Sequence, residues 1–254
     1  MRFGVIVIGD ELLSGKRRDR HLPHVIEALG AQGFELAWAV FVGDDAGDLT
    51  ATLRRTLAGP EAVVCFGGIG ATPDDRTRQC AAAAAGLALT RHPEAVAEIE
   101  ARFAEAAYPQ RIRMAELPQG ARIIPNPYNR IPGFSLGEHH FLPGFPDMAW
   151  PMLDWVLEHY YAGQRPRQAS VEHRLRVRGR YESELLDLME AFTRRFPQLR
   201  LSSLPTLAGQ SPEIELGVRG APEAAAEANR WLRSALDEAG VAWEALDAPA
   251  GPGP

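Results

Sequence analysis

The first ninety residues alternate between continuous apolar runs and segments with helical spacing. Residues 3–8 are almost entirely apolar, which is typical of a strand buried on both faces of a parallel sheet. Leu22, Val25, Ile26 and Leu29 follow with the spacing of one helix face. The pattern predicts strands at 3–8, 35–44 and 61–70, and helices at 20–33, 46–59 and 72–89. This alternation indicates a three-layer αβα fold, a doubly wound and mostly parallel sheet.

The pattern becomes less regular between residues 93 and 162. We expect a helix over 93–107, a strand over 121–124, and a proline-rich loop over 125–133. Residues 134–142 read as two short strands around a Gly-Glu turn, and an aromatic-rich helix follows. The first domain is therefore predicted to span 1–162.

A polar stretch with glycine and proline, residues 163–169, is the predicted linker. The order strand, helix, strand, strand, helix, strand follows, at 170–178, 181–195, 199–204, 212–218, 221–239 and 241–246. This order predicts a small α+β ferredoxin-like domain over 170–247, which we expect to mediate dimerisation or cover a cleft. The tail 248–254 is expected to be disordered.

Composition narrows the classes of function. The 254 residues are 46% hydrophobic, so the chain can bury a sizeable core. The net charge of −6 argues against partners such as nucleic acid or anionic membrane. No apolar run reaches signal-peptide or membrane-spanning length, and Cys65 and Cys80 lack partners for a zinc site. We therefore expect a cytoplasmic protein with two buried thiols.

The ends of the predicted strands carry the candidate chemistry. Gly9-Asp10-Glu11 follows the first strand, glycines 67, 68 and 70 follow the third, and residues 142–146 follow a later one. In an open parallel sheet, ligands bind beyond the carboxyl ends of the strands. Glycines there let a ligand approach the backbone, whose N–H groups can face an anion.

The loop after the third strand is the sharpest of these signals. Thr72 is a natural helix N-cap and Pro73 suits the first helical position, so a phosphate could rest at that helix start. Asp74 and Asp75 would repel a bare phosphate, whereas Mg²⁺ bridges carboxylates and phosphates. A capping box of Thr72 and Asp75 is an equally good explanation of the loop alone. Asp10 could likewise be an ordinary turn residue.

Five motifs in order resemble the N-terminal domain of the CinA family, within the MoaB/Mog molybdopterin-binding fold. They are GDELLSGKRRD, VGDD, GGIGATPDDRT, PNPYNRIPGF and LPGFP, and GRYESELLDL resembles the CinA middle domain. The resemblance implies a homo-oligomer, dimer or trimer, with a cleft for molybdopterin or a pyrophosphate-containing nucleotide. In CinA-type relatives the domain is associated with metal-dependent hydrolysis of ADP-ribose. The C-terminal amidohydrolase domain of full-length relatives is not expected here.

Carried over by position, the resemblance implies the following site. The catalytic acids would be Asp10, Asp19, Asp74 and Asp75, of which Asp10 and Asp75 would bind Mg²⁺ or another divalent cation. The ligand-binding residues would be Gly9, Glu11, Lys16, Gly67, Gly68, Gly70, Thr72, Thr77, Asn126, Gly133, Gly144 and Pro146. The chain departs from the family pattern at Asp19-Arg20-His21, where the motif usually continues Asp-x-Asn.

Two readings of function follow. The first is a metal-dependent pyrophosphatase acting on ADP-ribose-like nucleotides, because such chemistry needs a metal to neutralise phosphate oxygens and activate water. The second is a protein that binds molybdopterin or a nucleotide without turnover, linked to molybdenum cofactor biosynthesis.

Three groups of basic residues are interpreted as structural rather than functional. We expect His21 on the surface at the helix start, and His139 and His140 on alternate faces of a strand, a poor metal pair. Arg174, Arg176 and Arg178 share one strand face and are expected to be a solvated or interdomain surface.

Overall fold

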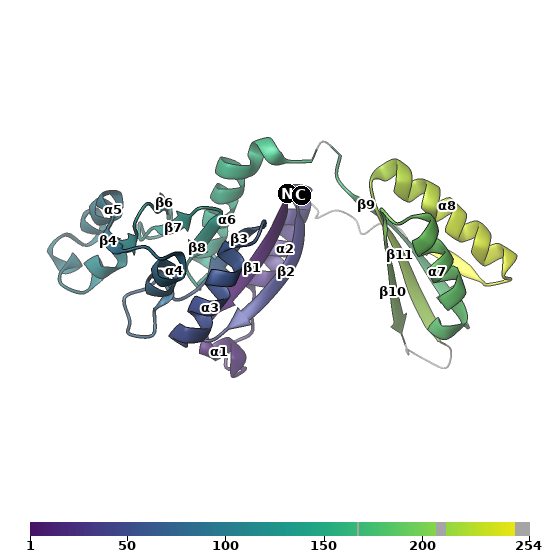
Figure 1. Ribbon diagram of the computed structural model, residues 1–254, viewed down its shortest axis with the longest axis horizontal. Helices are drawn as coiled ribbons and strands as arrows, with labels where there is room; N and C mark the ends of the chain where they lie inside the picture. The colour runs from purple at the N-terminus through teal and green to yellow at the C-terminus, as the bar shows by residue number, and fades with distance from the viewer. Residues whose placement is uncertain (167, 207–211, 247–254) are drawn as a thin grey trace. The chain divides into compact units, whose positions relative to one another are not determined.

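The computed structural model describes residues 1–166, 168–206 and 212–246. The chain divides into two compact units, Met1–Pro166 and Arg167–Pro254 (Figure 1). The predicted linker, 163–169, contains this division, and the predicted tail, 248–254, lies outside the described residues. No helix in the described ranges combines the length and apolar character needed to cross a membrane.

The first unit is built on a six-stranded sheet in the order β2-β1-β3-β8-β7-β6. Neighbours from β2 to β8 are parallel, while β7 runs antiparallel to both β8 and β6. The strands are β1 (Arg2–Ile8), β2 (Glu35–Val42), β3 (Ala62–Phe66), β6 (Arg122–Ile124), β7 (Gly133–Leu136) and β8 (His139–Leu142). The predicted apolar runs thus form β1, β2 and β3, of which β1 and β3 are central while β2 lies at the edge.

Helices cover both faces of this sheet, α3 (Ala46–Leu57) and α4 (Thr77–Ala85) on one face and α2 (His21–Ala31) and α6 (Pro146–Tyr161) on the other. The first unit also contains the short α1 (Asp10–Leu13) and α5 (Pro93–Phe103). Alternate residues of β1 enter two separate cores, as the period of a strand requires. Ile6 and Ile8 pack in the core that includes residues of α3 and α4, whereas Val5 and Val7 pack in the core that includes residues of α2 and α6.

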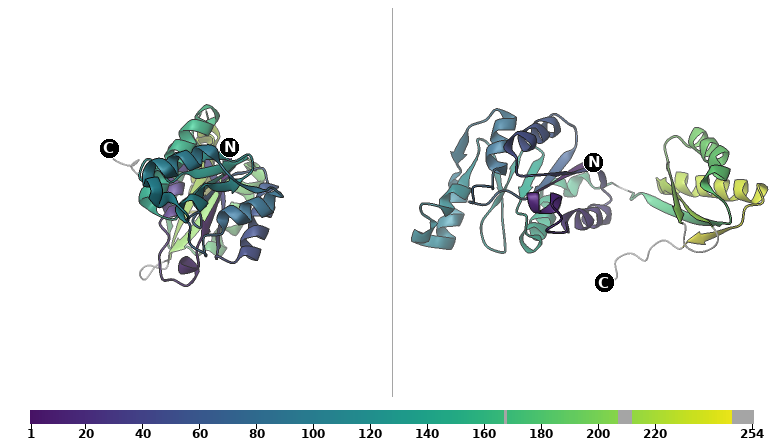
Figure 2. Two further views of the ribbon diagram at one scale, coloured as in Figure 1. Left: turned by 90° about the vertical axis from the view of Figure 1, so that its left-hand side faces the viewer. Right: turned by 90° about the horizontal axis from the view of Figure 1, so that it is seen from below.

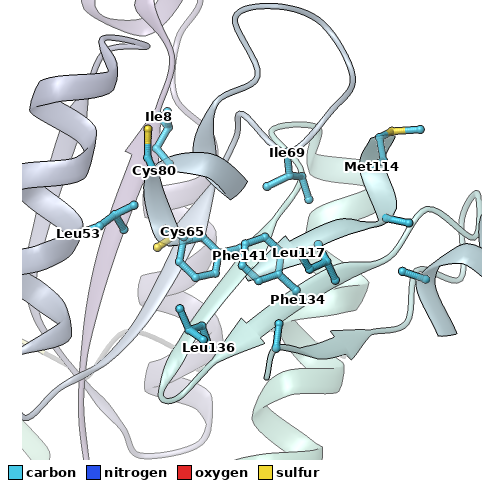
Figure 3. Close-up of a cluster of buried hydrophobic side chains, with 14 of the residues drawn as sticks. Ile8, Leu53, Cys65, Ile69, Cys80, Met114, Leu117, Phe134, Leu136 and Phe141 are labelled. Carbon is cyan, nitrogen blue, oxygen red and sulfur yellow. The ribbon is translucent and has the colours of Figure 1, made fainter. Parts of the chain in front are cut away.

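Figure 3 shows the first of these cores, where Cys65 and Phe141 project from neighbouring strands β3 and β8. Both side chains are fully buried, as is Phe134 of β7, whose ring stacks 4.4 Å from that of Phe141. Burying a large apolar side chain contributes about 1.5–3 kcal/mol. Cys65 and Cys80 are buried free thiols, as predicted.

A small lobe lies outside the regular alternation and was not predicted. Strand β4 (Leu89–Arg91) pairs antiparallel with β5 (Glu116–Pro118), and the 3-10 helices η1 (Ala104–Ala107) and η2 (Arg111–Ala115) lie between them in sequence. The predicted helix over 72–89 was too long, because residues 89–91 belong to β4. The predicted helix over 93–107 ends as an α-helix at Phe103.

Arg78 ties this lobe to the loop after β3. The side chain is buried, and its Nη2 donates to the Gly70 carbonyl at 2.6 Å. Its Nη1 donates to the carbonyls of Arg113 and Glu116. Burial lowers the pKa of the guanidinium from its ordinary value. One cation therefore joins three carbonyls from two separate segments.

The second unit is a four-stranded antiparallel sheet in the order β10-β11-β9-β12. Its strands are β9 (Val171–Arg178), β10 (Arg200–Thr206), β11 (Glu213–Gly220) and β12 (Trp243–Leu246). Helices α7 (Leu186–Arg195) and α8 (Pro222–Glu238) lie together on one side of this sheet (Figure 1 and Figure 2). The short η4 (Glu182–Leu185) precedes α7, and η3 (Ala162–Gln164) lies at the end of the first unit. The predicted ferredoxin-like order is confirmed.

The three arginines of β9 are paired with glutamates on neighbouring strands. Arg174 lies 3.1 Å from Glu215, and Arg176 lies 2.9 Å from Glu244. Arg178 lies 2.9 Å from Glu244 and 3.1 Å from Glu213. Within the described part of the chain, this sheet face therefore neutralises its own positive charge.

Candidate functional site

A cavity of about 390 Å³ opens at the carboxyl ends of β1, β3 and β8. Three loops meet there, as the sequence predicted from the strand ends. Of the predicted ligand-binding residues and catalytic acids, the cavity is lined by Gly9, Glu11, Gly67, Gly68, Gly70, Thr72, Asp74, Asp75, Asn126 and Gly144. We call this cavity the main cleft. Its size suits a nucleotide or pterin-sized ligand.

The glycine loop after β3 is held from below by Thr77. Gly67 and Gly68 have φ values of 107° and 68°, which side-chain-bearing residues rarely adopt. Thr77 Oγ1 donates to the Gly67 carbonyl and Thr77 N–H to the Gly68 carbonyl, both at 3.0 Å. A Cβ on Gly68 would lie 2.2 Å from Thr77 Oγ1. Thr77 is fully buried and supports the loop rather than lining the cleft.

The expected helix start at Thr72 is wrong. Helix α4 begins at Thr77, and residues 72–75 form a turn closed by the Asp75 side chain. Asp75 Oδ2 accepts the Thr72 N–H at 3.0 Å and the Thr72 hydroxyl at 2.5 Å. The nearby Thr72 hydroxyl is also the largest cause that lowers the pKa of the exposed Asp74. Thr72 thus orients the Asp75 carboxylate.

Asp10 and Asp44 form a reciprocal pair across the ends of β1 and β2. Asp10 N–H donates to Asp44 Oδ2 at 3.0 Å, and Asp44 N–H donates to Asp10 Oδ1 at 3.1 Å. A Cβ on Gly43 would lie 2.4 Å from Asp10 Oδ1, so a side chain at this position would displace the Asp10 carboxylate. Asp10 does not line the main cleft itself, whereas Asp44 does. Sequence reasoning quoted VGDD but missed Asp44, although β2 neighbours β1.

Asp44 carries the electrostatic signature of an acidic cluster. Burial raises the pKa of Asp44, and the negative charges of Asp10, Glu11 and Asp74 raise it further. The hydrogen bond from Asp10 N–H opposes that rise. Carboxylates from three loops therefore repel one another at this end of the cleft, which is an arrangement that a cation relieves.

The acids do not form a ready-made cage. In the described ranges, no three His, Cys, Asp or Glu side chains are grouped closely enough to hold a metal. Mg²⁺ is commonly bound by one or two carboxylates together with substrate phosphates and water. The donor set of the main cleft fits that mode, in which phosphate supplies the remaining oxygens.

The wall of the main cleft also includes apolar and amide side chains. The apolar ones are Ile69, Met114, Ile131, Phe145 and Met148. Asn126 shapes the proline-rich loop, because its Nδ2 donates to the Ile131 carbonyl at 2.9 Å and its Oδ1 accepts the Tyr128 N–H at 3.0 Å. Such a wall suits the planar ring of a base or pterin.

A second cavity of about 290 Å³ adjoins the main cleft. The two cavities share Ile8, Glu11, Arg17 and Gly144. The second is also lined by Arg18, Asp19, Arg20, His21 and Pro146, and we call it the basic pocket. Two predicted site residues, Asp19 and Pro146, therefore lie here rather than in the main cleft.

His21 is buried in the basic pocket, so the surface position expected from the sequence is wrong. Its ring stacks on Phe66 at 4.2 Å, and its Nε2 lies 3.1 Å from the Gly144 carbonyl. Burial lowers the pKa of His21. Asp19 Oδ1 and Oδ2 accept the N–H groups of His21 and Leu22, each at 2.9 Å. The Asp19 carboxylate thus caps α2.

The other predicted residues lie apart from both cavities. Lys16 is exposed and lines neither of them. Gly133 is buried in β7, where a Cβ would lie 2.4 Å from the Phe141 carbonyl. His139 and His140 lie on a buried strand and bond different partners, Thr56 for the first and Ser135 and Tyr161 for the second.

This fold and cleft define a protein of the molybdopterin-binding class. A family model described as "Probable molybdopterin binding domain" matches residues 4–162, and the chain belongs to that family. The resemblance to CinA-like proteins and the predicted molybdopterin-binding fold class are confirmed.

Three similar proteins show how far the likeness extends. A "CinA-like protein" of Anaeromyxobacter sp. (strain K) is 35% identical over 63% of this chain and 41% of its own length. A "Putative competence-damage inducible protein" of Symbiobacterium thermophilum is 31% identical over 93% of this chain and 57% of its own length. The solved structure of CinA from Thermoplasma acidophilum, a protein "with unknown function", is 29% identical. It covers 62% of this chain and 96% of its own, with a TM-score of 0.58. The chain thus spans about half the length of the curated relatives.

Proposed function

We propose that the main cleft hydrolyses a pyrophosphate-linked nucleotide, of the ADP-ribose type, with the help of a divalent cation. One observation carries the proposal. The cavity that contains the glycine loop also contains Glu11, Asp44, Asp74 and Asp75, and mutual repulsion contributes to the raised pKa of Asp44. A ligand that brings phosphates together with a cation satisfies the glycine backbone and the acids at once.

Asp44 and Asp75 are the proposed metal-binding carboxylates, because both line the main cleft whereas Asp10, the residue expected from the sequence, does not. Mg²⁺ is the proposed ion, and when bound it would neutralise phosphate oxygens and lower the pKa of a bound water. One oxygen of each carboxylate is used within the chain, Oδ2 of Asp44 by Asp10 N–H and Oδ2 of Asp75 by Thr72. These bonds orient the carboxylates and leave the other oxygen of each for a ligand.

Asp74 is the proposed acid that positions the attacking water. It lines the main cleft, and its lowered pKa keeps it ionised near neutral pH. Asp19 was also predicted to be a catalytic acid, but both of its oxygens accept helix N–H groups. We therefore assign the role to Asp74 and leave Asp19 as the cap of α2.

The test is turnover of ADP-ribose by wild-type chain and by Asp75→Asn, with Mg²⁺ and Mn²⁺ in turn. Asparagine retains an acceptor for Thr72 but lacks the charge, so we expect a loss on the order of 100-fold. Asp154→Asn is the matched control, because Asp154 is exposed on α6 and lines neither cavity. Equal release of AMP by wild type and Asp75→Asn would refute the proposal.

A second candidate is binding of molybdopterin without turnover. The apolar wall formed by Ile69, Ile131 and Met148 favours it, because a planar ring can lie against such side chains. Calorimetry would then show pterin affinity, with no metal-dependent product from any nucleotide. Absence of pterin affinity would rule out this candidate.

A further inference from the structure

One edge of the first unit's sheet is long, apolar and open. Strand β2 pairs with β1 on one side, and in the described ranges no strand pairs with its other side (Figure 1). The strand has eight residues, and residues 36–42 contain neither a charged side chain nor proline. Such an edge presents backbone N–H and C=O groups with which another strand can pair.

The other edges of the two larger sheets are protected. Strand β6, at the opposite edge of the same sheet, has three residues and begins with the exposed Arg122. In the second unit, edge strand β10 contains Pro205, and edge strand β12 has four residues that include Glu244. Short strands, charges and proline are the means by which proteins keep sheet edges from pairing. Strand β2 has none of these beyond its first residue, Glu35.

The exposed side chains of β2 lie on the sheet face that α2 covers. Trp38 and Val42 pack in the core that includes residues of α3 and α4. Because successive side chains of a strand point to opposite faces, Ala39 and Phe41 project on the α2 face. Both are exposed, Phe41 to 39%.

Ile26 of α2 extends this apolar surface. His24 stacks on Trp150 of α6 at 4.1 Å, and the next residue, Val25, is buried in the core. Successive helix residues are about 100° apart, so Ile26 lies on the flank of α2 away from α6. Since α2 packs on β1 and β2, that flank adjoins the open edge, and Ile26 is 52% exposed there. Several apolar side chains around one strand edge indicate an interaction surface.

We propose that this surface joins two copies of the chain, with their β2 strands paired antiparallel about a two-fold axis. A pairing centred on Val40 fits the sizes of the side chains. Ala39 of each copy is then opposite Phe41 of the other, and Trp38 is opposite Val42, so each large ring meets a smaller side chain. Such cross-strand pairs are the unit of sheet stabilisation, and a closed two-fold contact is the commonest form of homo-oligomer.

Charge and area both favour a second copy as the occupant. The net charge of −6 makes two copies repel one another, so their contact must be uncharged, as residues 36–42 and Ile26 are. A stable interface involves about 20–30 residues on each partner, so the strand alone is too small and the flank of α2 contributes. Antiparallel pairing points the carboxyl ends of the two sheets in opposite directions. The two main clefts therefore stay open, and the proposal does not depend on what they bind.

Sedimentation equilibrium of the full chain measures its mass and its dissociation constant. We expect a mass twice the 27.8 kDa of one chain at about 10 μM. Ala39→Lys combined with Phe41→Lys should weaken association by at least about 100-fold, because the dimer would bury charges without partners. Both positions are exposed in the single chain, so the variant should fold, which thermal melting checks.

Leu204→Lys is the matched control, because Leu204 is 59% exposed on β10, an edge strand of the other sheet. It should leave the dimer intact. A monomeric or trimeric wild type would overturn the proposal, and so would a dimer that survives the double lysine variant. Dissociation by Leu204→Lys alone would also overturn it, and would assign the interface to the second unit.

Val40→Cys tests the register. Two thiols at the centre of the pairing lie on directly opposed positions, whose Cβ atoms are about 4.5–5.5 Å apart, near the range of a disulfide. Oxidation should therefore give a covalent dimer, whereas Leu204→Cys should not. Cys65 and Cys80 are buried, so they contribute little background. Failure of Val40→Cys to form a covalent dimer would overturn the pairing centred on Val40.

Discussion

The first unit buries histidines in two places, and the two places differ in how their nitrogens are satisfied. His140 has a partner at each nitrogen, Ser135 Oγ at 2.8 Å and the Tyr161 hydroxyl at 2.6 Å. His21 has a partner only at Nε2, and its Nδ1 is buried without one. The first arrangement is complete within the chain. The second leaves one buried nitrogen without a partner in the described part of the chain.

The proton positions around His140 follow from its partners. Tyr161 OH donates to Glu138 Oε2 at 2.6 Å, so its oxygen accepts from His140 Nε2–H. His140 Nδ1 then accepts from the Ser135 hydroxyl. In this series of hydrogen bonds each side chain donates to the next in one direction, which stabilises the neutral imidazole of His140.

The largest expected effect is a loss of stability in acid. Burial lowers the pKa of His139 to about 4 and that of His140 to about 3. Unfolded histidines take up protons below about pH 6.5, while these two stay neutral in the fold, so stability falls as pH falls. Between pH 7.5 and 5.5 we expect the free energy of unfolding to drop by about 2–3 kcal/mol.

Urea unfolding at a series of pH values measures this drop. His140→Gln, which does not titrate, should remove about half of it. His159→Gln should leave the slope unchanged, because His159 is an exposed residue of α6. An unchanged slope in His140→Gln would contradict the explanation.

Tyr161→Phe is expected to cost about 1–3 kcal/mol, because it leaves His140 Nε2–H buried without an acceptor. The matched control is Tyr160→Phe, whose hydroxyl has no partner in the described part of the chain. Urea unfolding at pH 7 compares the two. Equal costs would show that the hydrogen-bonded chain contributes nothing specific.

The arginines of β9, like His140, are paired within the chain, but we expect each of their pairs to contribute less to stability. Arg176→Gln breaks pairs with Glu213 and Glu244, but Arg178 still contacts both glutamates. Since these groups are partly exposed, we expect the opening free energy of this sheet to fall by about 1 kcal/mol or less. Amide hydrogen exchange in β9 and β11 measures it, with Arg194→Gln on α7 as the control. A fall in the opening free energy as large as that expected for Tyr161→Phe would contradict the comparison.

The smallest effect on stability is expected for His21→Phe. The change removes a bond to the Gly144 carbonyl, but it also removes an unsatisfied buried nitrogen and keeps the stacking on Phe66. We expect a change below about 1 kcal/mol in urea unfolding. A cost as large as that of Tyr161→Phe would mean that His21 is a structural histidine like His140.

The sequence predicted the strands and the meeting of three loops because those follow from local periodicity and from the topology of parallel sheets. It misplaced the start of α4, because Thr72 and Pro73 look like a cap while the deciding bonds come from Asp75 and Thr77. The burial of His21 had a signal that was not used. His21, Val25 and Leu29 are four residues apart and share the buried face of α2.

Hydrogen bonds between residues far apart in the sequence could not be predicted from local sequence patterns. The pairing of Asp10 with Asp44 joins residues 34 apart in the chain, and only the adjacency of β1 and β2 brings them together. Arg78 likewise finds its carbonyls in a lobe whose two short strands carry no strong apolar pattern. The predicted acids could be given separate roles only once these contacts were known.

The main cleft has walls of unequal stiffness. The glycine loop is braced from beneath by Thr77 and bound to the β4–β5 lobe by the buried Arg78, so these parts should move as one body. The loop at Gly144 lies against the glycine loop, since a Cβ on Gly144 would be 3.4 Å from Gly67 Cα, and its carbonyl accepts a hydrogen bond from His21 of α2. We therefore expect the glycine loop, the Gly144 loop and the start of α2 to stay fixed relative to one another, and any change in the width of the main cleft to come from its other loops.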